Sequence, residues 1–197
     1  MSEMPEVLTI GHSTHAFDRF LALVRQAGAT AIADVRTSPF SRRCPHFNRD
    51  VLSETLRLEG ISYVFLGNEL GGRPTDPGLY CEGVADYEKM AATESFRQGL
   101  DRVVEGASTH RIALMCAERD PLDCHRCLLV ARALAERGVA VAHALSDGAI
   151  APHAEIEERL LQLCGHGAHD LFATRAERLA GAYRDRARKV AYARSRP

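Results

Sequence analysis

The feature that most constrains the fold of this chain is a regular alternation of short apolar runs with segments of helical periodicity. Apolar runs of strand length occur at residues 7–10, 29–35, 61–66, 111–116 and 139–145. Strands separated by helices pair in parallel through crossover connections and are covered on both faces. Five strands are too few for a closed eight-stranded barrel. The sequence therefore predicts a three-layer α/β/α fold with a mostly parallel sheet of about five strands.

The segments between and after these strands are expected to form a surface loop, helices that pack on the sheet, and a C-terminal extension. Residues 73–83 contain prolines and glycines without periodicity and indicate a surface excursion, and one long helix is expected from about residue 85 to residue 105. We expect residues 1–165 to form the α/β domain and residues 166–197 to form a basic helical extension. The segment Gly165-His166-Gly167 is the expected hinge between them.

Charge is unevenly distributed along the chain. Residues 164–197 carry eight Lys or Arg and three Asp or Glu, a balance of +5, so the remainder of a chain of net charge −1 carries −6. A basic tail on an acidic body suits nucleic acid or another acidic partner. The alternative is that the tail is a solvated helix face.

Composition bears on the compartment as well. The chain has no run of about eighteen uncharged apolar residues, and residues 1–7 lack the basic-then-apolar pattern of a secretory signal. Its six cysteines are scattered among long apolar elements, unlike the dense cysteines of a disulfide scaffold. We expect a cytoplasmic protein with free thiols and no membrane association.

The most informative stretch runs from Arg111 to Val130. It begins as a buried strand, breaks at Glu118-Arg-Asp-Pro, and resumes as an amphipathic helix. Cys116 falls at the end of the strand. Cys124 is expected in the first turn of the helix, where unpaired amides and the helix dipole favour an anion or a thiolate. We therefore expect this stretch to bind a ligand or to take part in a reaction, without a signal for which ligand or reaction.

Other reactive side chains are expected beside Cys116. In a parallel sheet the crevice lies beyond the carboxyl ends of the strands. The residues that fall at this edge are His12, Ser13, Asp34, Arg36, Gly71, Cys116, Glu118 and His143. The sequence thus gathers polar and reactive side chains at one edge of the sheet.

Two groups of candidate site residues follow. The catalytic candidates are Cys116, Glu118, Cys124 and His125, with Glu118 as a general acid or base. The alternatives are that the cysteines pack as small apolar residues, that Asp120 or Asp123 caps the helix, and that Glu118 is a surface carboxylate. The substrate-binding candidates are His12, Ser13, Asp34, Arg36, Gly71, Gly72 and Arg126.

The substrate expected from these residues is a small anion. The guanidinium of Arg36, with Arg42 and Arg43 nearby in sequence, suits a phosphate or a carboxylate. The alternative is that Arg36 pairs internally with Asp34, since residues two apart on a strand point the same way.

These motifs together resemble a known bacterial family. The matching segments are Gly11-His-Ser, Asp34-Val-Arg with Pro39 and Ser41, Leu70-Gly-Gly, and Cys116-Ala-Glu with Cys124-His-Arg. They are similar to those of the family known as domain of unknown function 488, over roughly residues 8–163. The resemblance implies an α/β fold and supplies no established reaction. Cys127 and the basic tail lie outside the family's pattern.

Three functions remain open from the sequence. The first is an enzyme in which a thiol of Cys116 or Cys124, activated by His125, acts on an anionic substrate, or a thiol-redox protein using Cys124 and Cys127. The second is a zinc or iron–sulfur site built from Cys116, Cys124, Cys127 and either His125 or His12. The third is a nucleic-acid-binding module using the basic tail. The sequence does not decide whether a metal or another cofactor is bound.

Overall fold

The computed structural model describes residues 6–167 and 173–194, and its centre is a six-stranded sheet in the order β3-β2-β6-β1-β7-β8. The five parallel strands are β1 (Glu6–Gly11), β2 (Ala31–Asp34), β3 (Ser62–Phe65), β6 (Ile112–Cys116) and β7 (Ala140–Ala144). These are the five strands that the apolar runs predict. The sixth strand, β8 (Ile150–Pro152), was not expected and pairs antiparallel with β7 at the edge.

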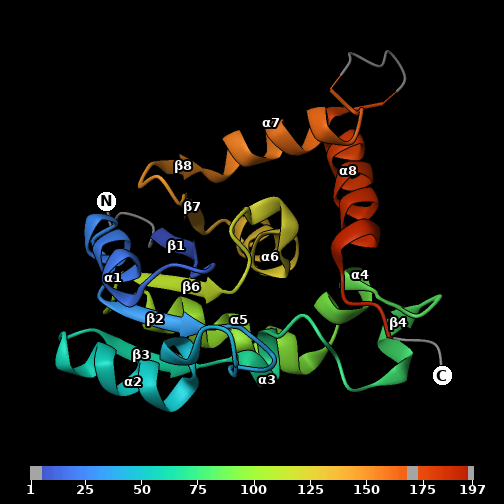
Figure 1. The fold of residues 1–197 in the computed structure, drawn as a ribbon. Coiled ribbons are helices and arrows are strands. Elements are labelled where there is room, and N and C mark those ends of the chain that lie inside the picture. Colours follow the sequence, from blue (N-terminus) through green and yellow to red (C-terminus); the bar gives the residue numbers. More distant parts are fainter. Residues whose placement is uncertain (1–5, 168–172, 195–197) are drawn as a thin grey trace.

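Helices cover both faces of the sheet, as parallel crossovers require (Figure 1). One face packs against α1 (Phe17–Gln26) and α2 (Arg49–Leu58), and the shared core includes Phe20 and Leu52. The other face packs against α5 (Glu94–Gly106), α6 (Arg132–Glu136) and α7 (His153–Leu163). The predicted α/β fold class is confirmed.

The expected long helix is in fact two helices. They are α4 (Tyr87–Ala91) and α5, and the chain breaks between them at Ala92 and Thr93. The Thr93 hydroxyl accepts a hydrogen bond from the amide of Phe96 at 3.2 Å and so caps α5. The expectation of one helix is wrong because a threonine cap within an apolar periodic segment starts a new helix.

The remaining short elements lie around the carboxyl edge of the sheet. They are η1 (Pro45–Phe47), α3 (Gly67–Leu70), η2 (Pro77–Leu79), β4 (Tyr80–Cys81) and β5 (Val84–Ala85). The predicted surface excursion is thus a short hairpin, β4–β5. The segment that follows α8 lies beside this hairpin at Tyr192, whose carbonyl accepts the amide of Ala85 at 2.9 Å.

The basic extension forms one helix, α8 (Arg175–Val190), that runs from the end of α7 towards the β4–β5 hairpin (Figure 1). Its start is fixed by a capping box between Thr174 and Glu177. The helix buries Ala182 and Tyr183 against the rest of the chain. The division into two parts near residue 165 stays a prediction. Among the described residues, no helix combines the length and apolar composition needed to cross a membrane.

Candidate functional site

The candidate site forms where three neighbouring parallel strands end. The register of the sheet places Gly11 of β1 beside Cys116 of β6, and Asp34 of β2 beside Met115. The chain then passes very close to β1, because a Cβ atom on Gly11 would lie 1.9 Å from the Glu118 carbonyl oxygen. Only glycine permits this approach. The loop that follows Cys116 is therefore held directly over the end of β1.

Two contacts shape this loop. The Asp120 carboxylate accepts the backbone amide two residues later at 2.9 Å and so caps the 3-10 turn η3 (Pro121–Asp123). The Arg126 guanidinium donates to the carbonyl oxygens of Glu118 at 2.7 Å and Arg119 at 3.1 Å. Arg126, a predicted substrate-binding residue, is 1% exposed and supports the loop from behind.

Cys124 is the residue that starts the following helix. Its backbone is extended, with φ −139° and ψ 139°, and its carbonyl accepts the amides of Cys127 at 3.1 Å and Leu128 at 3.0 Å. Its Sγ accepts the amide of Arg126 at 3.4 Å, as the side chain of an N-cap does. Cys124 therefore lies immediately before the helix, not in its first turn as expected. The helix opens with a π-helical turn, η4 (Arg126–Ala131).

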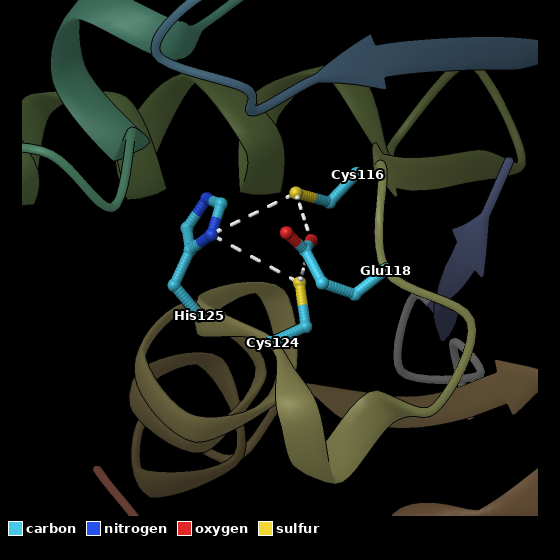
Figure 2. A group of neighbouring side chains, drawn as sticks. All are labelled: Cys116, Glu118, Cys124 and His125. Carbon is cyan, nitrogen blue, oxygen red and sulfur yellow. Dashed lines mark hydrogen bonds between the residues drawn. The ribbon is translucent and has the colours of Figure 1, made fainter. Parts of the chain in front are cut away.

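The four predicted catalytic side chains converge on one point (Figure 2). Cys116 Sγ lies 2.9 Å and Cys124 Sγ lies 3.1 Å from the same carboxylate oxygen of Glu118. The Nδ1 atom of His125 lies 3.7 Å from the sulfur of Cys116 and 3.9 Å from that of Cys124. One ligand atom from each residue lies within 4.8 Å of all the others. We call these four residues the cysteine cluster.

The orientation of His125 is fixed by its other nitrogen. Nε2 lies 2.8 Å from the carbonyl oxygen of Val35, and because a carbonyl only accepts, Nε2 carries the hydrogen. The imidazole also packs on Gly72, where a Cβ atom would lie 2.7 Å from the ring. Nδ1 is therefore directed at the two sulfurs.

The two thiols of the cluster differ in acidity. Burial opposes ionisation of Cys124, but its hydrogen bond with Cys116 and the charge of Arg126 bring its pKa well below the usual value. Burial raises the pKa of Cys116, and the neighbouring Cys124 raises it further. Burial and the charge of Cys124 also raise the pKa of Glu118. Cys124 is thus the sulfur that ionises first.

Arg36 forms the internal ion pair that the sequence offered as an alternative. Its guanidinium donates to both carboxylate oxygens of Asp34, at 2.9 and 2.6 Å, and to the carbonyl of Phe47 at 2.8 Å. A further nitrogen lies 3.2 Å from Nε2 of His12. Burial, and next the charge of Arg36, lower the pKa of His12 to about 4. Tyr63 completes the network by donating to Asp34 at 2.7 Å.

A pocket of about 240 Å³ opens above the cysteine cluster and the Arg36 ion pair. Five of its lining residues are predicted site residues: Arg36, Gly72, Cys116, Glu118 and His125. The others are Thr37, Ser38, Arg73, Tyr87, Ala117, Asp123, Val190 and Tyr192. The pocket thus joins the reactive side chains to residues of the loop after β2, to Gly72 and Arg73, and to residues at the end of α8 and just beyond it.

Several predicted site residues lie outside the lining of this pocket. They are His12, Ser13, Asp34, Gly71, Cys124 and Arg126. Cys124 lies beneath Cys116 and Glu118, while Asp34 and His12 hold Arg36. Ser13 donates its amide to the Ala117 carbonyl at 2.9 Å, which ties the end of β1 to the loop. These residues position the wall of the pocket.

Sequence reasoning missed Arg73 and Tyr192. The Arg73 guanidinium lies over the Tyr192 ring, 4.9 Å from its centroid, and its amide donates to the Thr37 hydroxyl at 3.0 Å. The position of Arg73 directly after Gly71 and Gly72 was a usable signal. No sequence signal pointed to Tyr192, because it reaches the pocket only through the direction in which α8 packs on the domain.

Two other predicted residues belong to a separate buried cluster. Cys127 comes together with His143 and His153, and not with Cys116 and Cys124. The Nε2 atom of His143 lies 2.8 Å from Nδ1 of His153, and the Thr9 hydroxyl lies 2.8 Å from Nδ1 of His143. The sequence left open whether Cys127 joins a metal or redox site with Cys124; in the structure Cys127 instead groups with histidines of β7 and α7.

Comparison with known proteins adds one finding. The family model described as "Domain of unknown function DUF488" matches residues 16–133, which is more than half of the chain. The matched segment includes all four residues of the cysteine cluster and ends before α8. Comparison with curated proteins and with solved structures gives no match.

Proposed function

We propose that this chain, which belongs to the DUF488 family, is an enzyme acting on a small anionic substrate. The proposal rests on the site that residues within the matched segment form. In this proposal the cysteine cluster supplies the reactive groups and an arginine of the pocket binds the anion. We also propose a cytoplasmic setting, which is supported by the six free cysteines.

One observation carries the proposal: reactive side chains and guanidinium groups line the same pocket. Cys116, Glu118 and His125 form its floor, and Arg36 and Arg73 contribute positive charge. The charge of Arg36 is already matched by Asp34. We therefore assign the substrate anion to Arg73, which is exposed and suits a phosphate or a carboxylate.

Glu118 is the group we assign to proton transfer. Its raised pKa brings it closer to neutral pH, where a carboxyl group can both donate and accept a proton. It also lines the pocket and contacts both sulfurs. The reaction class that these groups suit is hydrolysis or group transfer at a centre next to the anionic group.

Anion binding is the first test. Isothermal titration with inorganic phosphate and with malonate is expected to show binding that Arg73→Gln weakens by about tenfold, the value of one lost charged hydrogen bond. Arg97→Gln is the matched control, because Arg97 pairs with Glu94 on the surface of α5. Equal affinities in wild type and Arg73→Gln would contradict the assignment of Arg73.

Turnover is the second test. Assays with p-nitrophenyl phosphate and with the mono-p-nitrophenyl ester of succinate, which are both anionic, are expected to show activity that Glu118→Gln lowers by about 100-fold or more. Cys81→Ser should leave the rate unchanged, because Cys81 is exposed on the β4–β5 hairpin. A protein that binds the probe anions and turns over neither ester would be a binding protein and not an enzyme of this class.

A further inference from the structure

We propose that the cysteine cluster is a Zn²⁺ site, with Cys116, Glu118, Cys124 and His125 as its four ligands. Binding would displace to solvent the protons that the two thiols still carry, since the thiolate is the form that coordinates a metal. The site itself stands on the geometry of the cluster. Its part in catalysis rests on the function proposed above.

The donor set selects the metal. Two sulfurs, one imidazole nitrogen and one carboxylate oxygen are the atoms that Zn²⁺ takes in tetrahedral sites. Calcium and magnesium prefer oxygen ligands throughout. An iron–sulfur cluster is usually held by four cysteines, whereas this group has two. Zinc is the metal that fits all four residues.

The spacing of the donor atoms fits as well. Tetrahedral bonds of about 2.0–2.3 Å place neighbouring ligand atoms roughly 3.3–3.8 Å apart. The two separations between His125 Nδ1 and the sulfurs, 3.7 and 3.9 Å, are close to this range. The separations from Glu118 to the sulfurs, 2.9 and 3.1 Å, are shorter because they are hydrogen bonds. A shift of a few tenths of an ångström in the Glu118 carboxylate brings its two separations into the range, and the remaining two separations among the four atoms are under 4.8 Å.

The surroundings hold the ligands in place. Metal-binding histidines usually donate their other nitrogen to a carbonyl or carboxylate, as His125 does to Val35 at 2.8 Å. The sulfur of Cys124 accepts the amide of Arg126 at 3.4 Å, which stabilises a thiolate. Both contacts hold a ligand residue in place, and Figure 2 shows the His125 ring and the Cys124 sulfur directed towards the centre of the cluster.

The open side of the cluster indicates a reactive metal. Structural zinc sites are closed, whereas catalytic sites keep a position for water or substrate. Cys116, Glu118 and His125 line the pocket, and Cys124 lies beneath them. Glu118 is the ligand we expect to be displaced, because a carboxylate on a flexible side chain leaves more easily than a thiolate. Water bound in its place would be activated next to the anion site.

The buried group of Cys127, His143 and His153 provides the comparison. Its two histidines already bond to each other, and His153 also lies 3.1 Å from the Tyr183 hydroxyl. The nitrogens that a metal needs are thus engaged. A cysteine in this group serves as a matched control for a cysteine of the cluster, since both are buried.

Metal content and cobalt spectroscopy test the site without reference to activity. Protein purified without chelator is expected to carry about one zinc per chain by mass spectrometry of the metal. After removal of the zinc, titration with Co²⁺ should give thiolate-to-cobalt charge-transfer absorption and the visible bands of a tetrahedral ion. Calorimetry in buffers of different ionisation enthalpy should show that binding releases protons.

Variants assign the ligands. Cys124→Ser and His125→Gln are expected to weaken zinc binding by about 100-fold or more, whereas Cys127→Ala and Cys81→Ser should retain it. Circular dichroism shows whether each variant is folded. If Cys124→Ser does not fold, the cobalt spectrum of the wild-type protein tests the zinc site without it. Thiolate absorption would support the site, and its absence would contradict it.

Three metal-binding results would overturn the zinc site. They are a wild-type protein that takes up neither metal, a cobalt spectrum without thiolate absorption, and equal zinc affinity in wild type and Cys124→Ser. Ready oxidation of Cys116 and Cys124 to a disulfide in zinc-containing buffer would also overturn it, in favour of a redox pair. Turnover of the anionic substrate by metal-free protein would leave the proposed enzyme standing and remove only the role of zinc in catalysis.

Discussion

At the scale of single residues, the site depends on buried charges that have partners. Asp34 and Arg36 have side chains only 0% and 6% exposed, and each is neutralised by the other. Arg36 in turn contacts His12 and forms part of the pocket wall. A buried charge without its partner would not be solvated by water at this position. The pocket wall at Arg36 therefore depends on the ion pair with Asp34.

Asp34→Asn should therefore lower the free energy of unfolding by about 3–5 kcal/mol, the usual effect of leaving one partner of a buried pair uncompensated. Urea unfolding measures this value. Glu94→Gln, which removes the exposed partner of Arg97, should leave the stability nearly unchanged. If both variants were equally stable, Asp34 would not be needed to neutralise Arg36.

The residues of the site could be predicted only in part. Cys116, Glu118, Cys124 and His125 lie within ten positions of one another, so the strand end and the helix start bring them together. Arg73 and Tyr192 reach the same pocket from distant segments. Positions three apart in an α-helix share a face, which suggested that Cys127 could join Cys124. Cys124 instead lies before the helix and the first turn is π-helical, so Cys127 meets His143 of β7 and His153 of α7.

At the scale of elements, a chain of polar contacts joins β7, α7 and α8. It runs from Thr9 through His143 and His153 to Tyr183, whose hydroxyl also lies 3.3 Å from a Glu157 oxygen. Burial lowers the pKa of His153 to about 4. Burial also lowers the pKa of His143, so both histidines are neutral in the folded protein at neutral pH, and His153 contacts α8 through the Tyr183 hydroxyl.

This network makes stability depend on pH. Since the folded pKa of His153 is about 4 and the unfolded value is about 6.5, the unfolded state binds more protons between these values. Stability should fall as the pH drops from about 6.5 to about 4, by at most roughly 3 kcal/mol for this residue. Urea unfolding at several pH values should show a shallower fall in His153→Gln.

The control for this experiment is His110→Gln, since His110 is exposed on the surface. It should follow the wild-type pH dependence. A His153→Gln variant with the same slope as wild type would show that the network does not titrate in this range. His12, whose pKa is also lowered to about 4, would then be the group to examine.

The sequence predicts the repeating elements and misses the irregular ones. The five parallel strands follow from apolar runs, but β8 has three residues, one of them proline, and is recognisable only from its pairing with β7. The π-helical turn after Cys124 has no sequence signature either, and it sets the direction in which Cys127 points. Such features follow from packing and not from local periodicity.

At the scale of the whole molecule, the basic tail is matched by the acidic body. Ion pairs link Arg175 to Glu158, Arg184 to Glu88, and Arg186 to Asp123. The last of these pairs attaches α8 to the turn before Cys124, and the end of the same segment supplies Tyr192 to the pocket. These contacts favour a structural role for the tail over nucleic-acid binding.

Binding to heparin tests this interpretation of the tail. Because the paired arginines are engaged within the chain, we expect elution at low salt and no change in Arg188→Gln/Lys189→Gln, which alters two exposed cations of α8. Elution at high salt that this double substitution abolishes would instead support a polyanion partner. The substitution leaves Ala182 and Tyr183 in place, so the helix should stay docked.

The central claim is that the chain holds zinc between two thiolates, an imidazole and a carboxylate. X-ray absorption at the zinc edge, on protein loaded with one equivalent of metal, tests it most directly. The account predicts two sulfur neighbours at about 2.3 Å and two nitrogen or oxygen neighbours at about 2.0–2.1 Å. A shell of nitrogen and oxygen alone would contradict it, because the metal would then lie outside the cysteine cluster.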